Sequence, residues 1–285
     1  MKDLQTILET WAKWRAKDLH TKHKFVTATE YGKYKELKDY RDRECDLSTE
    51  EMHYSDGKPP ATKPDVVFSE EFANDGSVER EQTFSRTKRT KSSLHWSITE
   101  SIKFGMEITA SASVPELVSV TEQQSFEIGL SSTQAIDYSS EEEWTVSTRI
   151  PVPPRTVTTA EMVIDTEKFE LPFQQDAVLT GDVAIWFEDK VKMGSGKDKH
   201  NLFFKPIDSV FREVVMNRLI DTAGYSIRGN GAVAATASGT LTANQNVRCR
   251  TDVHDRPYGT PRPPRSADQR TIEETDQPAT STAYR

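Results

Sequence analysis

The sequence predicts a mainly β protein, elongated and built of long antiparallel strands, with an N-terminal helical region and one amphipathic helix near residue 210. Three observations predict this fold. Only 35% of the 285 residues are hydrophobic, whereas 55 are Ser or Thr. From about Val66 the apolar residues recur at every second position, as in strands. A helical period of three to four residues occurs at the N-terminus and again after Pro206.

The N-terminal region, residues 1–64, is predicted to be helical and rich in aromatic residues. Apolar side chains repeat at helical spacing from Leu4 to Trp14. Three tyrosines, Tyr31, Tyr34 and Tyr40, lie on a second and shorter helical pattern. Such tyrosines are typical of a packed interface, but exposed aromatic rings with a polar tip also suit contact with a receptor or glycan. Both roles stay open at this point, and Tyr31, Tyr34 and Tyr40 are the candidate receptor contacts.

Residues 65–250 read as a β module that one helix interrupts. The sequence Asn74-Asp75-Gly76-Ser77 predicts a hairpin turn, and alternation predicts strands at 144–150, 155–164 and 177–187. The helix begins at Pro206, where the missing N–H of proline is tolerated. The last segment, 251–285, is rich in Pro and Arg, and we expect a flexible tail.

The most informative stretch, residues 94–138, predicts one long amphipathic hairpin. Counted from Thr83 to Ala160, 26 of 78 residues are Ser or Thr. If the pairing is centred on residue 116, even-numbered residues of both strands share one face. Val114, Pro115, Leu117 and Val118 would form the tip. The apolar row comprises Ile102, Phe104, Met106, Ile108, Ala110, Ala112, Phe126, Ile128 and Leu130.

The two strands, each of about twenty residues, exceed the usual length in globular proteins and could cross a bilayer, which needs about 9 to 11 residues. We expect the apolar row to face lipid and the opposite row, with Lys103, Glu107 and Glu127, to line a water-filled lumen. Two acids against one base predict a mild preference for cations. Glu122 and Gln124 interrupt the apolar row, so Glu122 is protonated on insertion, the register differs, or the hairpin spans in another way.

Several function classes are disfavoured. A net charge of −8 without a basic stripe argues against nucleic-acid binding. We find no motif for a catalytic residue, a metal or a cofactor, and expect no enzyme. Cys45 and Cys249 are expected to be free thiols. The N-terminal residues do not resemble a signal peptide, so we expect a soluble precursor made in the cytosol, deposited as an inclusion or released by another route.

The order of these segments resembles the aerolysin-like β-pore-forming proteins, and within them the branch of clostridial epsilon toxin and the mosquitocidal toxins of bacilli. The resemblance rests on the turn-containing segment 68–77, the hairpin with Val114-Pro115-Glu116-Leu117-Val118 at its tip, and Ile150-Pro151-Val152-Pro153-Pro154 before the next strand. It covers roughly residues 66–250. Both a bacterial toxin and an animal protein of this type fit the sequence.

The resemblance implies that the protein acts outside the producing cell, at a target membrane carrying an unidentified receptor or glycan. It implies a homo-oligomeric ring of six to eight chains, each contributing its hairpin to a β-barrel. In some relatives a C-terminal peptide is cleaved first, and here Arg256, Arg262, Arg265 and Arg270 are candidate cleavage sites. The alternative function is an oligomeric adhesion or agglutinating defence protein with the same fold and no pore.

Overall fold

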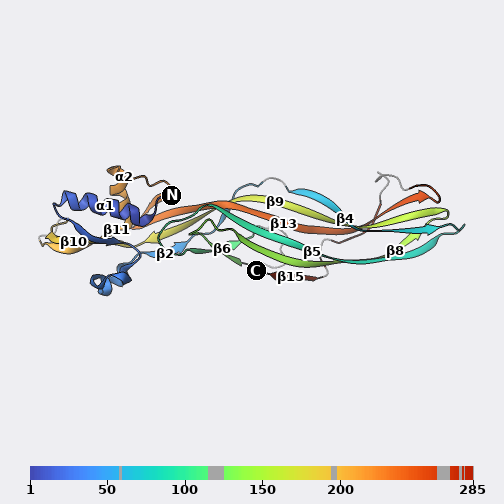
Figure 1. Ribbon diagram of the computed structural model, residues 1–285, viewed down its shortest axis with the longest axis horizontal. Coiled ribbons are helices and arrows are strands. Elements are labelled where there is room, and N and C mark those ends of the chain that lie inside the picture. Colours follow the sequence, from blue (N-terminus) through green and yellow to red (C-terminus); the bar gives the residue numbers. More distant parts are fainter. Residues whose placement is uncertain are drawn as a thin grey trace.

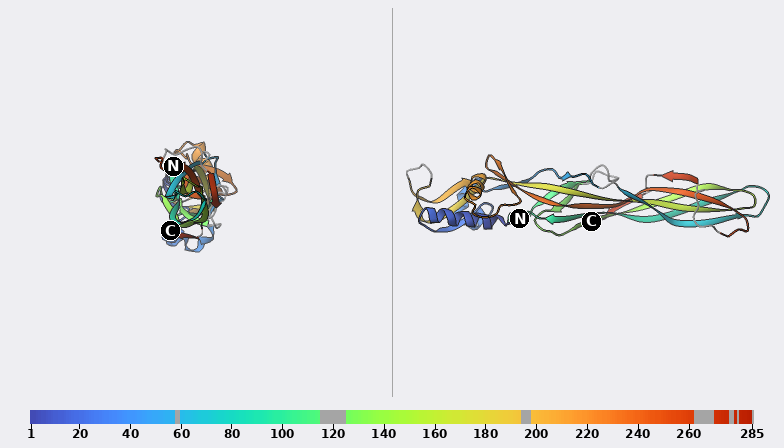
Figure 2. Two further views of the ribbon diagram at one scale, coloured as in Figure 1. Left: turned by 90° about the vertical axis from the view of Figure 1, so that its right-hand side faces the viewer. Right: turned by 90° about the horizontal axis from the view of Figure 1, so that it is seen from above.

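The chain forms a long, narrow rod with a helical head at one end (Figure 1). The structure is a computed structural model that describes residues 1–57, 60–114, 125–193, 198–261, 270–275, 278 and 280–284. Figure 2 shows how small the cross-section of the rod is when it is viewed end-on. The predicted class, a mainly β protein of long antiparallel strands, is confirmed. Among the described residues, no helix is long and apolar enough to cross a membrane.

Two strands, β9 (Thr156–Thr180) and β13 (Ala232–Pro257), form the spine of the rod. They pair in antiparallel fashion from Thr180 opposite Ala232 to Thr156 opposite Pro257. The sequence predicted separate strands at 155–164 and 177–187. The structure corrects both: the first continues to Thr180 as one strand, and the second spans the end of β9 and the start of β10 (Asp182–Val191). A ladder of this length keeps the two ends of the rod in a fixed relation.

Most of the other strands attach to this spine in one ten-stranded sheet. Three strands, β2 (Asp46–Thr49), β3 (His53–Tyr54) and β4 (Ala61–Asn74), pair with β9, and β12 (Tyr225–Gly229) pairs with β13. On the other edge of β13, β5 (Arg80–Glu100) pairs over residues 93–100 and carries β8 (Ile136–Val152) beside it.

At the end of the rod away from the head, residues 80–92 of β5 no longer pair with β13. Together with the residues of β8 that pair with them, they lie over the other strands as the second layer of a sandwich. Phe84 and Trp144 from this layer pack against Met162 and Val253 of the spine in one apolar cluster. Asn246 lies where the layers separate, and its side chain hydrogen-bonds Thr90 (3.0 Å), Glu142 (3.0 Å) and Thr166 (3.1 Å) on three other strands.

The C-terminal segment contains two strands, which corrects the expectation of a flexible tail from residue 251. The spine strand β13 continues to Pro257, β14 (Arg270–Thr275) pairs with its edge, and β15 (Thr280–Tyr284) pairs with the edge of β8. Composition alone suggested disorder, because this segment has few apolar residues of its own. Backbone hydrogen bonds to existing sheet edges provide the order instead.

The head combines two distant parts of the chain, so region 1–64 is not self-contained. Its sheet contains β1 (His23–Thr27), β10 (Asp182–Val191) and β11 (His200–Pro206). Short 3-10 helices lie at Tyr31–Lys33 and Lys35–Arg43. Figure 1 shows α1 (Leu4–Asp18) beside α2 (Ile207–Met216), the helix predicted near residue 210.

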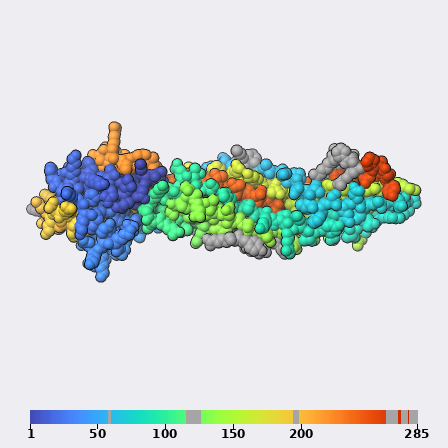
Figure 3. Space-filling model, viewed as in Figure 1, coloured from blue at the N-terminus to red at the C-terminus, as the bar shows by residue number. Residues whose placement is uncertain are grey.

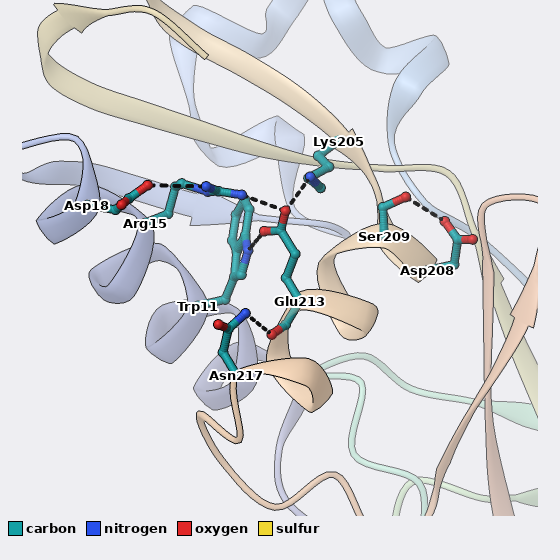
Figure 4. Close-up of polar contacts among 8 residues, drawn as sticks. All are labelled: Trp11, Arg15, Asp18, Lys205, Asp208, Ser209, Glu213 and Asn217. Carbon is teal, nitrogen blue, oxygen red and sulfur yellow. Dashed lines mark hydrogen bonds and ion pairs between the residues drawn. The ribbon is translucent and has the colours of Figure 1, made fainter. Parts of the chain in front are cut away.

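The carboxylate of Glu213 joins the two helices of the head (Figure 4). It accepts hydrogen bonds from the indole of Trp11 (2.8 Å), the guanidinium of Arg15 (2.5 Å) and the ammonium of Lys205 (2.7 Å). Burial disfavours the charged carboxylate, but these donors and the two positive charges outweigh that effect and lower the pKa of Glu213.

Glu213→Gln is expected to lower the free energy of unfolding by about 1–3 kcal/mol at pH 7, because two cations lose their partner. Since the folded-state pKa is lowered, this stabilisation is present above the unfolded pKa and disappears as pH falls through the lower, folded-state pKa. Urea unfolding of both proteins from pH 7 to pH 3 measures the difference. Glu81→Gln, in an exposed pair with Arg149, is the control and should change little. A pH-independent difference would contradict this assignment.

Candidate functional site

The candidate site is a small hairpin that lies against the rod, separate from the ten-stranded sheet. Within the part of the chain that the structure describes, its strands, β6 (Thr109–Ser113) and β7 (Ser125–Gly129), pair only with each other. The continuous hairpin predicted over residues 94–138 is therefore interrupted, because β5 ends at Glu100 and β8 begins only at Ile136. A straight hairpin would expose its apolar row to water in a single chain, and folding it back buries that row.

The predicted arrangement of faces is confirmed in the part that the structure describes. Ala110 lies opposite Ile128, and Ala112 lies opposite Phe126, so even-numbered residues of both strands share a face. The pairing is centred on residue 119 rather than 116, since Thr109 is opposite Gly129. The apolar row is buried, except that Met106 is half-buried; the buried members are Ile102, Phe104, Ile108, Ala110, Ala112, Phe126, Ile128 and Leu130.

The opposite face of the hairpin is in contact with water. Lys103, Glu107 and Glu127, the residues predicted for a lumen, are all exposed. Figure 3 shows the hairpin segment, in green, at the surface of the rod beside the N-terminal region in blue. The alternation read from the sequence thus separates a buried side from a hydrated one in this conformation.

Three aromatic rings hold the hairpin against the roots of β5 and β8. Phe126 of β7 lies 5.2 Å from Trp96 and 4.5 Å from Tyr138, measured between ring centroids. The Tyr138 hydroxyl donates to the Glu127 carbonyl (3.2 Å). Trp96 and Tyr138 are even-numbered members of the same alternating pattern, which is the signal that could have identified them.

Leu130 connects the hairpin to the rod through two different backbone partners. Its carbonyl accepts from Ile102 N (2.9 Å), and its own N–H donates to the Ile108 carbonyl (2.8 Å). The residues between these two partners, 103–107, form a loop that we call the root loop. Within it, Phe104 is buried 6.0 Å from the ring of Tyr225.

The root loop is tied to the head by contacts that sequence reasoning missed. The Lys103 carbonyl accepts from Leu4 N (2.9 Å). The hydroxyl of Tyr225 lies 3.2 Å from that carbonyl and 2.9 Å from the carbonyl of Lys2, so its single proton serves either acceptor. No local pattern indicates these pairs, because the partners are about a hundred or more residues apart in sequence.

Part of the predicted tip lies outside the described residues. Val114 is half-buried at the end of β6. Pro115, Leu117 and Val118 belong to the undescribed segment 115–124, as do Glu122 and Gln124.

The three tyrosines proposed as receptor contacts differ in exposure. Tyr31 is fully buried, and its hydroxyl donates to the Asp182 carbonyl (2.8 Å), so its role as a surface contact is corrected. Burial raises the pKa of Tyr31, with smaller contributions from nearby acidic groups. Tyr34 is half-buried and stacks on Phe25, and Tyr40 is 39% exposed.

Two aromatic residues absent from the sequence prediction complete this surface. Phe204 lies 4.9 Å from Tyr40 between ring centroids, with the Arg43 guanidinium 4.9 Å from its ring. Trp186 lies beside Phe25, and Lys24 is 5.8 Å from its ring. We call the half-buried and exposed rings of Tyr34, Tyr40, Trp186 and Phe204 the aromatic patch. Trp186 and Phe204 belong to strand patterns rich in core residues, so the sequence did not distinguish these two rings from the core.

The tail arginines fall in different environments. Arg256 is paired with Glu71 (2.9 Å) within β13, so it is not a free cleavage site in this conformation. Arg262 and Arg265 lie outside the described residues, and Arg270 begins β14. Cys45 and Cys249 are both buried thiols that form no disulfide in the described structure, in agreement with the predicted thiols, and burial raises the pKa of Cys45 to about 12, with nearby acids adding to it.

The chain resembles a cytotoxin in sequence, and it shares its fold with solved structures of bacterial proteins. It is 29% identical to a cytotoxin of Pseudomonas aeruginosa over 90% of each chain. Two solved structures share the fold. A non-toxic crystal protein from Bacillus thuringiensis has a TM-score of 0.65 at 16% identity, with 90% of this chain and 98% of that chain covered. The Mpp75Aa1.1 β-pore-forming protein from Brevibacillus laterosporus has a TM-score of 0.59 at 12% identity, with 99% of each covered.

The sequence pattern of one family matches residues 32–253, which include most of the head, the spine and the hairpin. This family is described as Clostridium epsilon toxin ETX and Bacillus mosquitocidal toxin MTX2. The separate amphipathic hairpin and the match over most of the chain agree, and the chain belongs to the ETX/MTX2 family of aerolysin-like pore-forming toxins.

Proposed function

We propose that this protein binds a target-cell surface, assembles into a ring of identical chains and inserts one hairpin from each chain into the membrane as a β-barrel. The observation that carries the proposal is the hairpin itself. Its apolar row is buried in a two-stranded sheet that pairs with no other strand in the described chain, and its polar row is already hydrated. Such a unit can leave the rod without breaking the ladder of the spine.

The energetics favour lipid as the next environment of the apolar row. Each large side chain such as Ile102, Phe126 or Leu130 contributes about 1.5–3 kcal/mol when it is removed from water. A hairpin released into water would lose this contribution, whereas a hairpin released into a bilayer would keep it. Closing the hairpins of several chains into a barrel then pairs every strand edge. If the ring forms before the hairpins leave the rod, no single hairpin has to expose its apolar row to water.

The tail strands support a role for proteolysis before assembly. The edge of β13 is covered by β14 and the edge of β8 by β15. We propose that cleavage between Pro257 and Arg270 frees both edges for contact with neighbouring chains. The candidate sites Arg262 and Arg265 lie in this interval.

The aromatic patch is the proposed contact with the target surface, whether receptor or glycan. It lies on the head and combines aromatic faces with the cations Lys24 and Arg43. Flat rings with nearby polar groups suit the faces of sugar rings and the aromatic anchors of protein interfaces. No catalytic residue is assigned to the protein.

A second candidate function is an adhesion or agglutinating protein with this fold and no pore. It is favoured by Glu122, which interrupts the apolar row in the sequence. The structural similarity to a crystal protein described as non-toxic is compatible with it. Release of calcein from loaded liposomes or target cells separates the two functions, since clumping without release would support adhesion alone.

The charges of the polar row set the ion preference of the proposed pore. In planar bilayers the wild-type protein is expected to prefer cations mildly, because Glu107 and Glu127 outnumber Lys103. Glu107→Lys with Glu127→Lys should reverse the sign of the reversal potential in a salt gradient. Both residues are exposed, so folding should be retained. Glu81→Lys, on β5 outside the hairpin, is the matched control; an unchanged potential in the double variant would exclude this row from the lumen.

The aromatic patch is tested by Tyr40→Ala. Loss of one exposed ring should weaken binding to susceptible cells about tenfold, equivalent to about 1.4 kcal/mol, while unfolding in urea is nearly unchanged. Flow cytometry of labelled protein measures the binding. Tyr258→Ala is the matched control, because that ring is 49% exposed in a turn at the far end of the rod. Equal binding of all three proteins would remove the patch from the contact surface.

A further inference from the structure

We propose that the hairpin is stored in a register six residues away from the one in which it inserts, and that the head holds it there through the root loop. This inference rests on the proposed pore function. It follows from the spacing of strand pairs, from the two partners of Leu130, and from the contacts of Lys103.

The two ladders that flank the root are out of register with each other. Trp96 is opposite Ile136 in the β5–β8 pair, and Thr109 is opposite Gly129 in the β6–β7 pair. Between these pairs the outgoing strand has twelve residues, 97–108, whereas the returning strand has six, 130–135. The outgoing strand therefore carries an excess of six residues.

Leu130 shows where the excess is stored. Its carbonyl bonds Ile102, the partner that the β5–β8 register requires, and its N–H bonds Ile108, the partner that the β6–β7 register requires. These partners are six positions apart. Residues 103–107, the root loop, therefore lie outside both ladders, and Phe104 projects into the core instead of along a strand.

A membrane barrel cannot keep this loop. Backbone N–H and C=O groups in lipid must be paired, and five unpaired residues in the barrel wall would leave several of them unsatisfied. Continuing the β5–β8 register through the hairpin removes the loop. It places Phe104 opposite Ile128 and Met106 opposite Phe126, and it moves the centre of the hairpin from residue 119 to residue 116.

The shift keeps every residue on its own face, because six is an even number and strand side chains alternate. The two registers differ in which apolar residues meet. The stored register sets the small Ala110 and Ala112 opposite Ile128 and Phe126, which leaves room for side chains of the rod. The shifted register sets large residues opposite one another, which suits a face that only lipid covers.

The head retains the root loop through Lys103. Its carbonyl accepts from Leu4 N, and the Tyr225 hydroxyl donates either to this carbonyl or to that of Lys2. The Tyr225 ring packs between Phe104 and Phe211 of α2. Leu4 is the first residue of α1, which Glu213 joins to α2. Movement of these helices therefore changes the position of the Leu4 N–H. Tyr225 is thus a positioning residue for the conversion, acting through the root loop.

Two engineered disulfides distinguish the registers. Ser111→Cys with Glu127→Cys links residues that are directly opposite now. Glu107→Cys with Ser125→Cys links positions that are opposite only after the shift. In the stored register Ser125 is opposite Ser113, which is six residues from Glu107, or about 20 Å of extended strand. Thr87→Cys with Thr145→Cys, on β5 and β8, is compatible with both registers and is the control, since the two hydroxyls are 3.0 Å apart.

Calcein release from liposomes of phosphatidylcholine and cholesterol is measured with and without reductant, and linked peptides are identified by mass spectrometry. The 111–127 bridge should abolish release reversibly, the 87–145 bridge should leave it unchanged, and the 107–125 bridge should form only in membrane-inserted protein. Full release by bridged 111–127 protein would overturn the register shift alone. No release by the unmodified protein, before or after trypsin treatment, would overturn the pore and the shift together.

Retention by the head is tested in solution, independently of any pore. Tyr225→Phe should raise amide hydrogen exchange at Ile102 and Leu130 about fivefold, the loss expected for one hydrogen bond. Tyr31→Phe removes a comparable buried hydroxyl contact within the head and should leave those amides unchanged. Leu4→Pro introduces proline at the first helical position, where it is tolerated, and removes the N–H that bonds Lys103. It should raise exchange at Ile102 and Leu130 more than Leu4→Ala does. Exchange equal to wild type in both Tyr225→Phe and Leu4→Pro would refute the retention.

Discussion

The need to keep one row of apolar side chains away from water governs the arrangement of this molecule. In a straight hairpin of a single chain the row from Ile102 to Leu130 would face water, and folding it back against the rod buries it. There it joins a core cluster that also includes Leu8 of α1 and Val210 of α2. Head, spine and hairpin consequently share one apolar core, and a change in any of them alters the cover of the hairpin.

The spine explains how a large rearrangement could leave the rest of the fold intact. β9 and β13 carry most of the ladder, and they hydrogen-bond neither β6 nor β7. Outside its own pair, the hairpin is retained by side-chain packing at Trp96 and Tyr138 and by a few backbone contacts at its root. Packing of this kind can be exchanged for lipid, whereas a ladder of backbone hydrogen bonds would first have to be broken.

Polar and charged side chains are distributed between hydrated strand faces and structural contacts in the interior. Many of the Ser and Thr residues that lowered the hydrophobic content lie on the long strands, where they tolerate water on one face without adding net charge. The ion pairs that are shielded from water are instead structural, as with the half-buried Glu213 between the helices and the buried Asp165 beside Arg248 in the sandwich (3.0 Å). The aromatic rings have two roles. Trp96 and Phe126 pack the hairpin against the rod, whereas Tyr40 and Phe204 belong to the aromatic patch of the head.

The sequence alone determined the fold class, the two faces of the hairpin, the helix after Pro206 and the free cysteines. These follow from local periodicity and composition, because a period of two fixes which side chains share a face whatever the chain does next. Only the tertiary structure decided that the hairpin is interrupted, that Tyr31 is buried, that the tail adds strands, and that Leu4 and Tyr225 hold Lys103. Each of these depends on which distant segment offers a hydrogen-bonding edge or an apolar surface, and alternation along the chain carries no information about such partners.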